Sequence, residues 1–222
     1  MPYKIKAYII KSIYRAYRLK IENQIRLYPN DAKMQRFLLD FNYEQNFKDD
    51  DFYVGKGNFH AFEMINKWPK WEKNFLNING EKFSGKSHLV NIFLKKFNGI
   101  RIDVNSLNDE NIKSIKPYQN IVLEDLNLNI NEKLIYSLFN IIDQDNKFLI
   151  VTSMKPISEI NFKLEDLRSR TKNCLFANIQ NPDDELMFAL ILKNLSDRQI
   201  TLDKKLINFI IKRIERSYGK IF

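Results

Sequence analysis

The sequence has 222 residues, is 44% hydrophobic and carries a formal net charge of +9. This length suits one α/β domain with a small appendage, and the apolar runs are too short for a transmembrane helix. One cysteine and two histidines exclude an internal disulfide and leave little material for a zinc site, which fits a reducing, cytoplasmic location.

The positive charge is concentrated at the start of the chain. Residues 1–33 hold eight Lys/Arg and two acidic residues, a net +6, so the remainder of the chain carries only +3. We interpret residues 1–33 as a basic N-terminal extension: either an amphipathic helix for an anionic surface, or a stretch that is not native, with Met34 as the true start. The low net charge of the remaining residues argues against direct binding to nucleic acid.

From Met34 onward the pattern predicts an α/β domain. Residues 34–50 read as a short tail and 51–178 as a core in which strands and helices alternate, which favours a parallel sheet covered on both faces. In chain order, the hydrophobic periodicity predicts a helix over Asn58–Lys67, a strand over Phe75–Ile78, a helix over His88–Lys96, strands over Ile100–Asp103 and Ile121–Asp125, a helix over Glu132–Ile142 and a strand over Phe148–Ser153.

The last part of the chain has a different pattern. Asp183–Leu195 and Asp203–Tyr218 both have apolar residues at helical spacing, and no further strand is predicted. Residues 179–222 are therefore expected to form a partial helical lid that is cut short at Phe222.

Gly80–Ser87 matches the whole phosphate-binding pattern G-x-x-x-x-G-K-[ST] between a predicted strand and a predicted helix. Such a turn directs backbone N–H groups and the positive end of a helix dipole at one point, which suits a triphosphate. We expect ATP or ADP with Mg²⁺, with Lys86 at the β- and γ-phosphates and the Ser87 hydroxyl on the metal. A chance match in a loop that contains Lys and Gly is the alternative.

Two acidic residues end the third predicted strand. A strand that delivers two carboxylates to the edge of a sheet can supply one to Mg²⁺ and the other to an attacking water. We therefore expect Glu124 to support the metal and Asp125 to polarise the nucleophile. A strand that merely ends in solvated acids is the alternative.

Two further segments are candidates for contact with a nucleotide because of their positions in the sequence. A hydroxyl of Thr152-Ser153, at the end of the fourth predicted strand, can bond the γ-phosphate or the attacking water, although ordinary capping of a strand end explains it as well. In the charged cluster Leu164–Arg170, an exposed Arg can enter the nucleotide site of a neighbouring subunit. A solvated helix face is the alternative for this cluster.

Together these motifs resemble the AAA+ domain of the DnaA/Hda family. Phe52–Ala61 is similar to its adenine-side motif, Ser153 falls at its sensor 1 position, and Leu167–Arg170 is similar to its box VII motif. The resemblance runs from about Met34 to Phe222. It implies a P-loop AAA+ three-layer α/β sandwich with a parallel sheet and a nucleotide held by Val54, Asn58, Gly80, Phe83, Ser84, Gly85, Lys86, Ser87 and His88.

Two features resemble the shorter Hda branch of the family. No DNA-binding helix-turn-helix is recognised after the AAA+ region. The tail contains Gln35–Phe41, which is similar to the branch's sliding-clamp-binding peptide and implies clamp contacts by Gln35, Leu38, Leu39 and Phe41. Trp68–Trp71 also resembles alphaproteobacterial members.

The Hda resemblance implies a partner and a role. Such a protein binds the sliding clamp and makes DnaA hydrolyse its ATP, with Arg170 as the arginine finger and Arg168 beside it. DNA contact is then indirect, and a homodimer is an open possibility. Two alternatives remain: a DnaA-like initiator or loader ATPase that acts directly on DNA, and a nucleotide-dependent scaffold without catalysis.

The sequence also departs from the family pattern. Glu124-Asp125 replaces Asp-Asp, which leaves intrinsic hydrolysis open, and Asp40 is acidic where the clamp peptide has an apolar residue. The sensor 2 arginine is expected near Gly219 or Lys220, and neither position holds Arg; Arg216 lies about one turn earlier.

Overall fold

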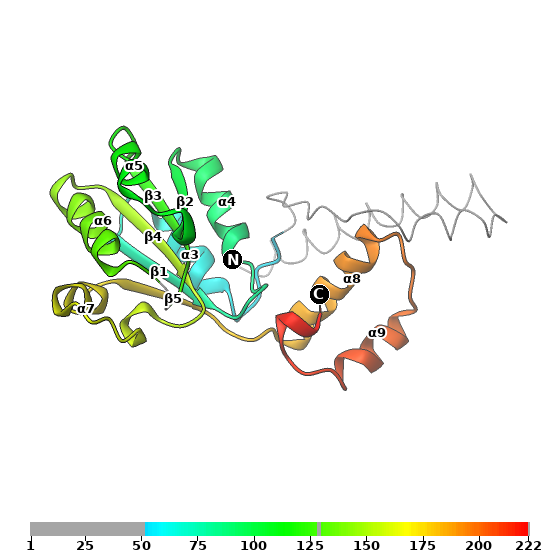
Figure 1. Cartoon of the computed structure of the whole chain (residues 1–222). Coiled ribbons are helices and arrows are strands. Elements are labelled where there is room, and N and C mark those ends of the chain that lie inside the picture. The colour runs from blue at the N-terminus through cyan, green and yellow to red at the C-terminus, as the bar shows by residue number, and fades with distance from the viewer. Residues whose placement is uncertain (1–51, 128–129, 222) are drawn as a thin grey trace. The chain divides into compact units, whose positions relative to one another are not determined.

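The computed structural model describes residues 52–127 and 130–221 (Figure 1). The N-terminal extension and the clamp-peptide-like segment Gln35–Phe41 lie outside the described residues. Within the described ranges, 52–191 and 203–221 belong to one compact unit and 192–202 to a second. The sheet and the candidate site belong to the first unit.

A five-stranded sheet forms the centre of this unit. Its strands run in the order β2-β3-β4-β1-β5, and every neighbouring pair is parallel. The bounds are β1 Phe75–Gly80, β2 Ile100–Asp103, β3 Asn120–Leu126, β4 Phe148–Ser153 and β5 Leu175–Ile179. The four predicted strands and the parallel sheet are confirmed. The fifth strand, β5, was not predicted.

Helices connect the strands and cover both faces of the sheet. Their bounds are α3 Phe59–Lys67, α4 Lys86–Lys96, α5 Asp109–Ser114, α6 Glu132–Gln144, α7 Glu165–Lys172, α8 Asp184–Asp197 and α9 Lys204–Ile211. Helices α3 and α4 lie on one face and α5 and α6 on the other, so that the sheet is the middle of three layers (Figure 1). The predicted P-loop α/β sandwich is thus confirmed.

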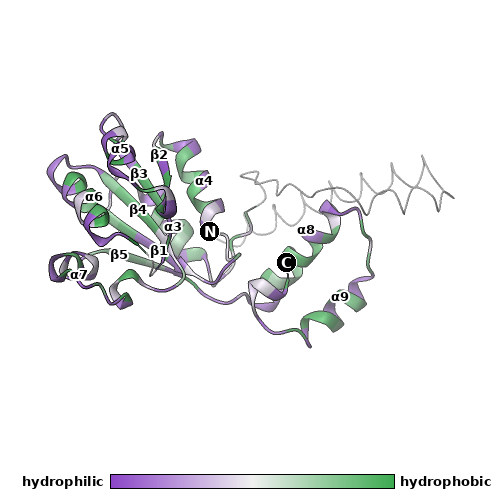
Figure 2. Ribbon diagram, in the orientation of Figure 1, coloured by the Kyte–Doolittle hydropathy of each residue, from purple (hydrophilic) through white to green (hydrophobic). Residues whose placement is uncertain are grey.

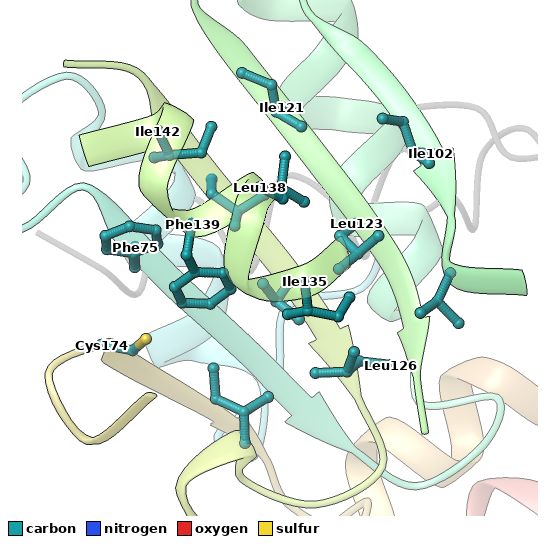
Figure 3. Packing of buried hydrophobic residues seen from close by; sticks show 14 of the residues in the cluster. Phe75, Ile102, Ile121, Leu123, Leu126, Ile135, Leu138, Phe139, Ile142 and Cys174 are labelled. Atoms are coloured by element: carbon teal, nitrogen blue, oxygen red, sulfur yellow. The ribbon is translucent and has the colours of Figure 1, made fainter. Parts of the chain in front are cut away.

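The two faces of the sheet are both apolar because successive strand residues point to opposite sides. In β3, Ile121 and Leu123 join a cluster with α6, whereas Val122 between them joins a cluster with α3 and α4. Figure 2 shows the resulting hydrophobic strands within the sheet. Phe75 and Phe139 stack with ring centroids 4.6 Å apart in the α6 cluster (Figure 3).

Cys174 lies in the same apolar cluster and is nearly fully buried. Burial raises the pKa of its thiol to about 12, while the Lys73 charge lowers it and the Asp143 carboxylate raises it to smaller extents. The thiol is therefore protonated at neutral pH and serves packing rather than nucleophilic chemistry.

The predicted helix over Asp203–Tyr218 is wrong in its extent, because α9 ends at Ile211. Tyr218 is nearly fully buried, and its hydroxyl donates to the Gln180 carbonyl at 3.1 Å. The burial of Tyr218 and its bond to Gln180 hold this part of the chain next to the end of β5, so that it does not continue α9. In addition, β5 crosses the boundary that was predicted at Asn178.

Asn77 joins three segments in the middle of the fold. This residue of β1 is fully buried, and its amide nitrogen donates to the Val151 carbonyl at 3.0 Å and to the Ser153 hydroxyl at 2.9 Å. Its amide oxygen accepts from the Ile157 backbone N–H at 3.0 Å. The side chain thus ties β1 to β4 and to the turn that follows β4.

We expect Asn77→Ala to lower the free energy of unfolding by about 2–4 kcal/mol, because it leaves buried polar groups without partners. Asn66→Ala is the matched control: Asn66 bonds the Phe62 carbonyl on the exposed side of α3, and its loss should change stability by no more than about 0.5 kcal/mol. Urea unfolding followed by circular dichroism measures both. Equal effects of the two variants would contradict the role of Asn77.

Candidate nucleotide site

The phosphate loop connects the end of β1 to the start of α4, as its sequence pattern requires. A Cβ on Gly80 would lie 2.9 Å from both the Ile179 carbonyl oxygen and the Ser84 hydroxyl, so β1 and β5 can approach here only with glycine. Gly85 precedes α4 with φ of 92°, a left-handed conformation that other residues rarely adopt. Glycine is therefore required for different reasons at the two positions: close packing against β5 at Gly80 and a left-handed backbone at Gly85.

Lys86 turns its ammonium group back into the loop. Its Nζ donates to the carbonyls of Gly80 and Glu81, each at 2.8 Å, and the side chain is largely buried. Burial lowers the pKa of Lys86, and the carboxylates of Asp125, Glu124 and Glu81 oppose that shift. The ammonium thus lies among backbone oxygens at the first turn of a helix, where its three donors suit a phosphate.

The remaining loop residues differ in exposure. Ser87, in the first turn of α4, is half-buried, and Phe83 is exposed with a φ of 66°. Ser84 is buried, and its hydroxyl oxygen has no hydrogen-bond partner. A buried hydroxyl without a partner inside such a loop fits a ligand oxygen that would satisfy it.

The two acids at the end of β3 lie in different environments. Glu124 is buried, its Oε2 lies 3.2 Å from the Arg101 Nε, and its Oε1 has no hydrogen-bond partner. Asp125 is exposed with φ of 57°, and its backbone N–H donates to the Thr152 hydroxyl at 3.0 Å. One buried acid with an unpaired oxygen, together with the Ser87 hydroxyl, fits a Mg²⁺ ion that takes most of its ligands from phosphate and water.

Within residues 52–127 and 130–221, no group of three or more His, Cys, Asp or Glu could hold a metal ion. The same ranges contain no helix that is both long and apolar enough to cross a membrane.

The adenine-side motif forms a tight loop next to the phosphate loop. The Asn58 side chain closes it, donating to the Tyr53 carbonyl at 2.9 Å and accepting from the Gly55 N–H at 2.8 Å. The Gly57 carbonyl accepts from the Gln180 N–H at 2.9 Å, which docks the loop at the end of β5. Asn58 therefore shapes the loop with its amide, while Val54 beside it is half-buried.

Phe52 connects this motif to the phosphate loop. Its Cε2 lies 3.1 Å from where a Cβ on Gly85 would be, and its ring meets the His88 ring edge-on with centroids 5.2 Å apart. His88 is correspondingly buried in α4. The structure thus brings the residues of both predicted nucleotide motifs to one edge of the sheet.

The hydroxyls at the end of β4 are engaged within the protein. The Ser153 hydroxyl donates to the Lys155 carbonyl at 2.6 Å and accepts from Asn77, and only 1% of the residue is exposed. The Thr152 hydroxyl accepts from the Asp125 N–H. A direct bond from Ser153 to a phosphate would require one of its present contacts to be given up.

Arg168 and Arg170 lie on α7, away from the phosphate loop of their own chain. Leu167 of α7 packs in the apolar cluster with α6, on the face of the sheet opposite to α4. Arg170 pairs with Asp143 and lies over the Tyr136 ring, 5.6 Å from its centroid, both on α6. The Arg168 Nε is buried without a hydrogen-bond partner.

Two residues of the site were missed by the sequence reasoning. Glu81 of the phosphate loop accepts from the Ser217 hydroxyl and, at 3.0 Å, from the Tyr218 N–H. Arg101 of β2 pairs with Glu124. Glu81 occupies a variable position of the motif, and Arg101 lies outside every motif, so only the folded chain reveals their partners.

No protein-family model matches the sequence. The chromosomal replication initiator protein DnaA of Borreliella afzelii (strain PKo) is 24% identical over 221 residues, which covers 87% of this chain and 45% of that protein. The chain spans 36–45% of the length of this and other curated DnaA relatives.

Solved structures of DnaA are similar in fold. Domain III of the Thermotoga maritima replication initiation protein DnaA has a TM-score of 0.65 at 18% identity, and the match covers 82% of this chain and 86% of that one. AMPPCP-bound DnaA from Aquifex aeolicus has a TM-score of 0.66 at 19% identity, covering 80% and 63% of the two chains.

The all-parallel sheet and the phosphate loop give the chain the P-loop α/β fold of DnaA domain III. Its curated sequence relatives are DnaA proteins at 24–27% identity, which agrees with the resemblance that the motifs indicated.

Proposed function

We propose that this chain is a cytoplasmic, nucleotide-binding AAA+ regulator of replication initiation, which stimulates ATP hydrolysis by DnaA in association with the sliding clamp. The observation that carries the proposal is the phosphate loop, where the buried Lys86 ammonium lies at the start of α4 and is influenced by the charge of the buried Glu124 carboxylate. The DnaA relatives supply the link to replication.

The nucleotide site is the first part of the proposal. Lys86 and the N–H groups at the start of α4 would hold the phosphates of ATP or ADP, and Ser87 and Glu124 would hold Mg²⁺. Val54, Asn58 and His88 would form the side of the site that receives the base. The AMPPCP in the Aquifex aeolicus structure supports a nucleotide in this fold.

We expect Lys86→Ala to weaken nucleotide binding by about 10- to 100-fold, because it removes a charge-assisted bond to phosphate. Lys82→Ala is the matched control, since Lys82 belongs to the same loop but lies exposed over the Phe83 ring, 5.1 Å from its centroid. Titration of both variants with MANT-ADP measures the affinities. Equal affinities would argue against the assigned loop.

Action on a partner's nucleotide is the second part. Arg170 lies across the sheet from α4, and this separation from its own phosphate loop supports a role at a neighbouring molecule's nucleotide. Its guanidinium pairs with Asp143 in a half-exposed site, and such surface pairs contribute little free energy. Arg170 can therefore exchange Asp143 for a phosphate of DnaA-bound ATP, where it would stabilise the developing charge.

We expect Arg170→Ala to lower the stimulated rate of ATP hydrolysis by DnaA at least about a hundredfold, toward the unstimulated rate. Asp143→Ala should keep or raise the stimulation, because it frees the guanidinium. Lys172→Ala, an exposed cation on the same helix, is the control and should leave the rate unchanged. Phosphate release from DnaA–ATP with clamp-loaded DNA measures all three. Full stimulation by Arg170→Ala would remove the finger assignment.

Clamp binding is proposed from the segment Gln35–Phe41. Replacing both Leu38 and Phe41 by Ala should abolish capture of the chain by immobilised clamp, because both apolar side chains are expected to fill the peptide-binding pocket. Phe47→Ala makes the same kind of change outside the peptide and should retain capture. Unchanged capture by the double variant would remove the docking proposal. Steeply salt-dependent binding to single-stranded DNA would instead favour a loader that acts on DNA.

A further inference from the structure

Arg101 occupies the metal side of the candidate site, although no motif includes it. In the parallel ladder it lies opposite Val122, so its side chain is on the α4 face of the sheet, as are those of Val122 and Glu124. The Arg101 Nε lies 3.2 Å from the Glu124 Oε2, and its Nη2 donates to the Asn91 side chain. The guanidinium thus bridges β3 and α4.

The position of Asn91 places this bridge near the predicted metal ligands. Asn91 lies one turn after Ser87 on α4, so the two side chains share a face of the helix. Glu124 stands across from that face and acts electrostatically on Lys86. Arg101 therefore lies close to the place where the Ser87 hydroxyl and the Glu124 carboxylate would hold Mg²⁺.

The ion pair with Arg101 makes the two oxygens of the Glu124 carboxylate inequivalent. Oε2 is taken by the guanidinium, whereas Oε1 is buried without a partner. The glutamate is only 8% exposed, so water solvates its charge poorly, although solvent screens part of the attraction because the Arg101 side chain is 37% exposed. A fixed positive charge so close to the carboxylate reduces its attraction for a second cation.

We propose that Arg101 sets how strongly nucleotide binding depends on Mg²⁺, by holding one oxygen of Glu124 and partly neutralising the carboxylate. This inference rests on the proposed nucleotide site. With Arg101 in place, the carboxylate offers one oxygen and a reduced charge to the metal, so Mg²⁺ adds little to the affinity for nucleotide. Without Arg101, both oxygens and the full negative charge face the metal.

The test is a comparison of MANT-ADP dissociation constants measured in EDTA and in excess Mg²⁺. We expect Arg101→Ala to raise the ratio of the dissociation constant in EDTA to the dissociation constant in Mg²⁺ at least about fivefold over that of the unmodified chain. The reason is that the unpaired carboxylate repels phosphate in EDTA and binds Mg²⁺ when the metal is present. Arg101→Lys keeps the charge and should stay near the original ratio. Glu124→Gln should bring the ratio close to one, and adding Arg101→Ala to it should change nothing further.

Lys67→Ala is the matched control, because it also removes one cation from an ion pair, the exposed Lys67–Glu63 pair of α3. Its ratio should equal that of the unmodified chain. Asn91→Ala loosens the guanidinium without removing it and should raise the ratio partway, which tests the proposal if Arg101→Ala does not fold.

An unchanged ratio in Arg101→Ala, or a fall to the value of Glu124→Gln, would overturn the inference while nucleotide binding itself stands. The fall would mean that Arg101 serves only to hold Glu124 in place. An unmodified chain that binds MANT-ADP in neither buffer would overturn the proposed nucleotide site and this inference with it.

Discussion

The position of β1 between β4 and β5 is the constraint on which the site depends. All six residues of β1 are buried, the strand pairs with β4 and β5 on its two sides, and its last residue, Gly80, pairs with Ile179 of β5. The phosphate loop starts from that residue, and Lys86 folds back onto the carbonyls at the end of the same strand. Because parallel strands end at one edge of a sheet, Glu124 and Ser153 reach this edge as well.

Much of the fold was predictable because β3 and β4 contain continuous apolar runs and the helices between the strands have regular periodicity. The strand β5 escaped prediction because Leu175–Ile179 contains Ala177 and Asn178, which are weak strand formers. Helix α7 escaped because Leu167 is its main apolar residue in a highly charged segment. The early end of α9 depends on the burial of Tyr218, a contact with Gln180 that local sequence does not encode. Sequence identified the loop that could hold phosphate, but the partners of Glu81 and Arg101 depend on register and long-range packing.

The two faces of the sheet separate two kinds of chemistry. The face with α3 and α4 carries the residues that suit a nucleotide, whereas the face with α6 and α7 carries the two arginines of the charged cluster. This separation is compatible with the proposal that the protein binds one nucleotide and acts on a partner's. Little free energy would be lost if Arg170 left its present contacts for a partner, since these are a half-exposed carboxylate and the Tyr136 ring.

The Glu81 carboxylate accepts hydrogen bonds from the Ser217 hydroxyl and the Tyr218 N–H, which lie 136 and 137 residues later in the sequence. One carboxylate satisfies both donors, so the phosphate loop cannot shift at Glu81 without either carrying the C-terminal segment along or breaking both bonds together. Tyr218 in turn bonds Gln180, whose N–H bonds Gly57 of the adenine-side loop. The phosphate loop and the adenine-side loop are thus connected by a continuous path of hydrogen bonds through Tyr218 and Gln180, although neither loop bonds the other directly along that path.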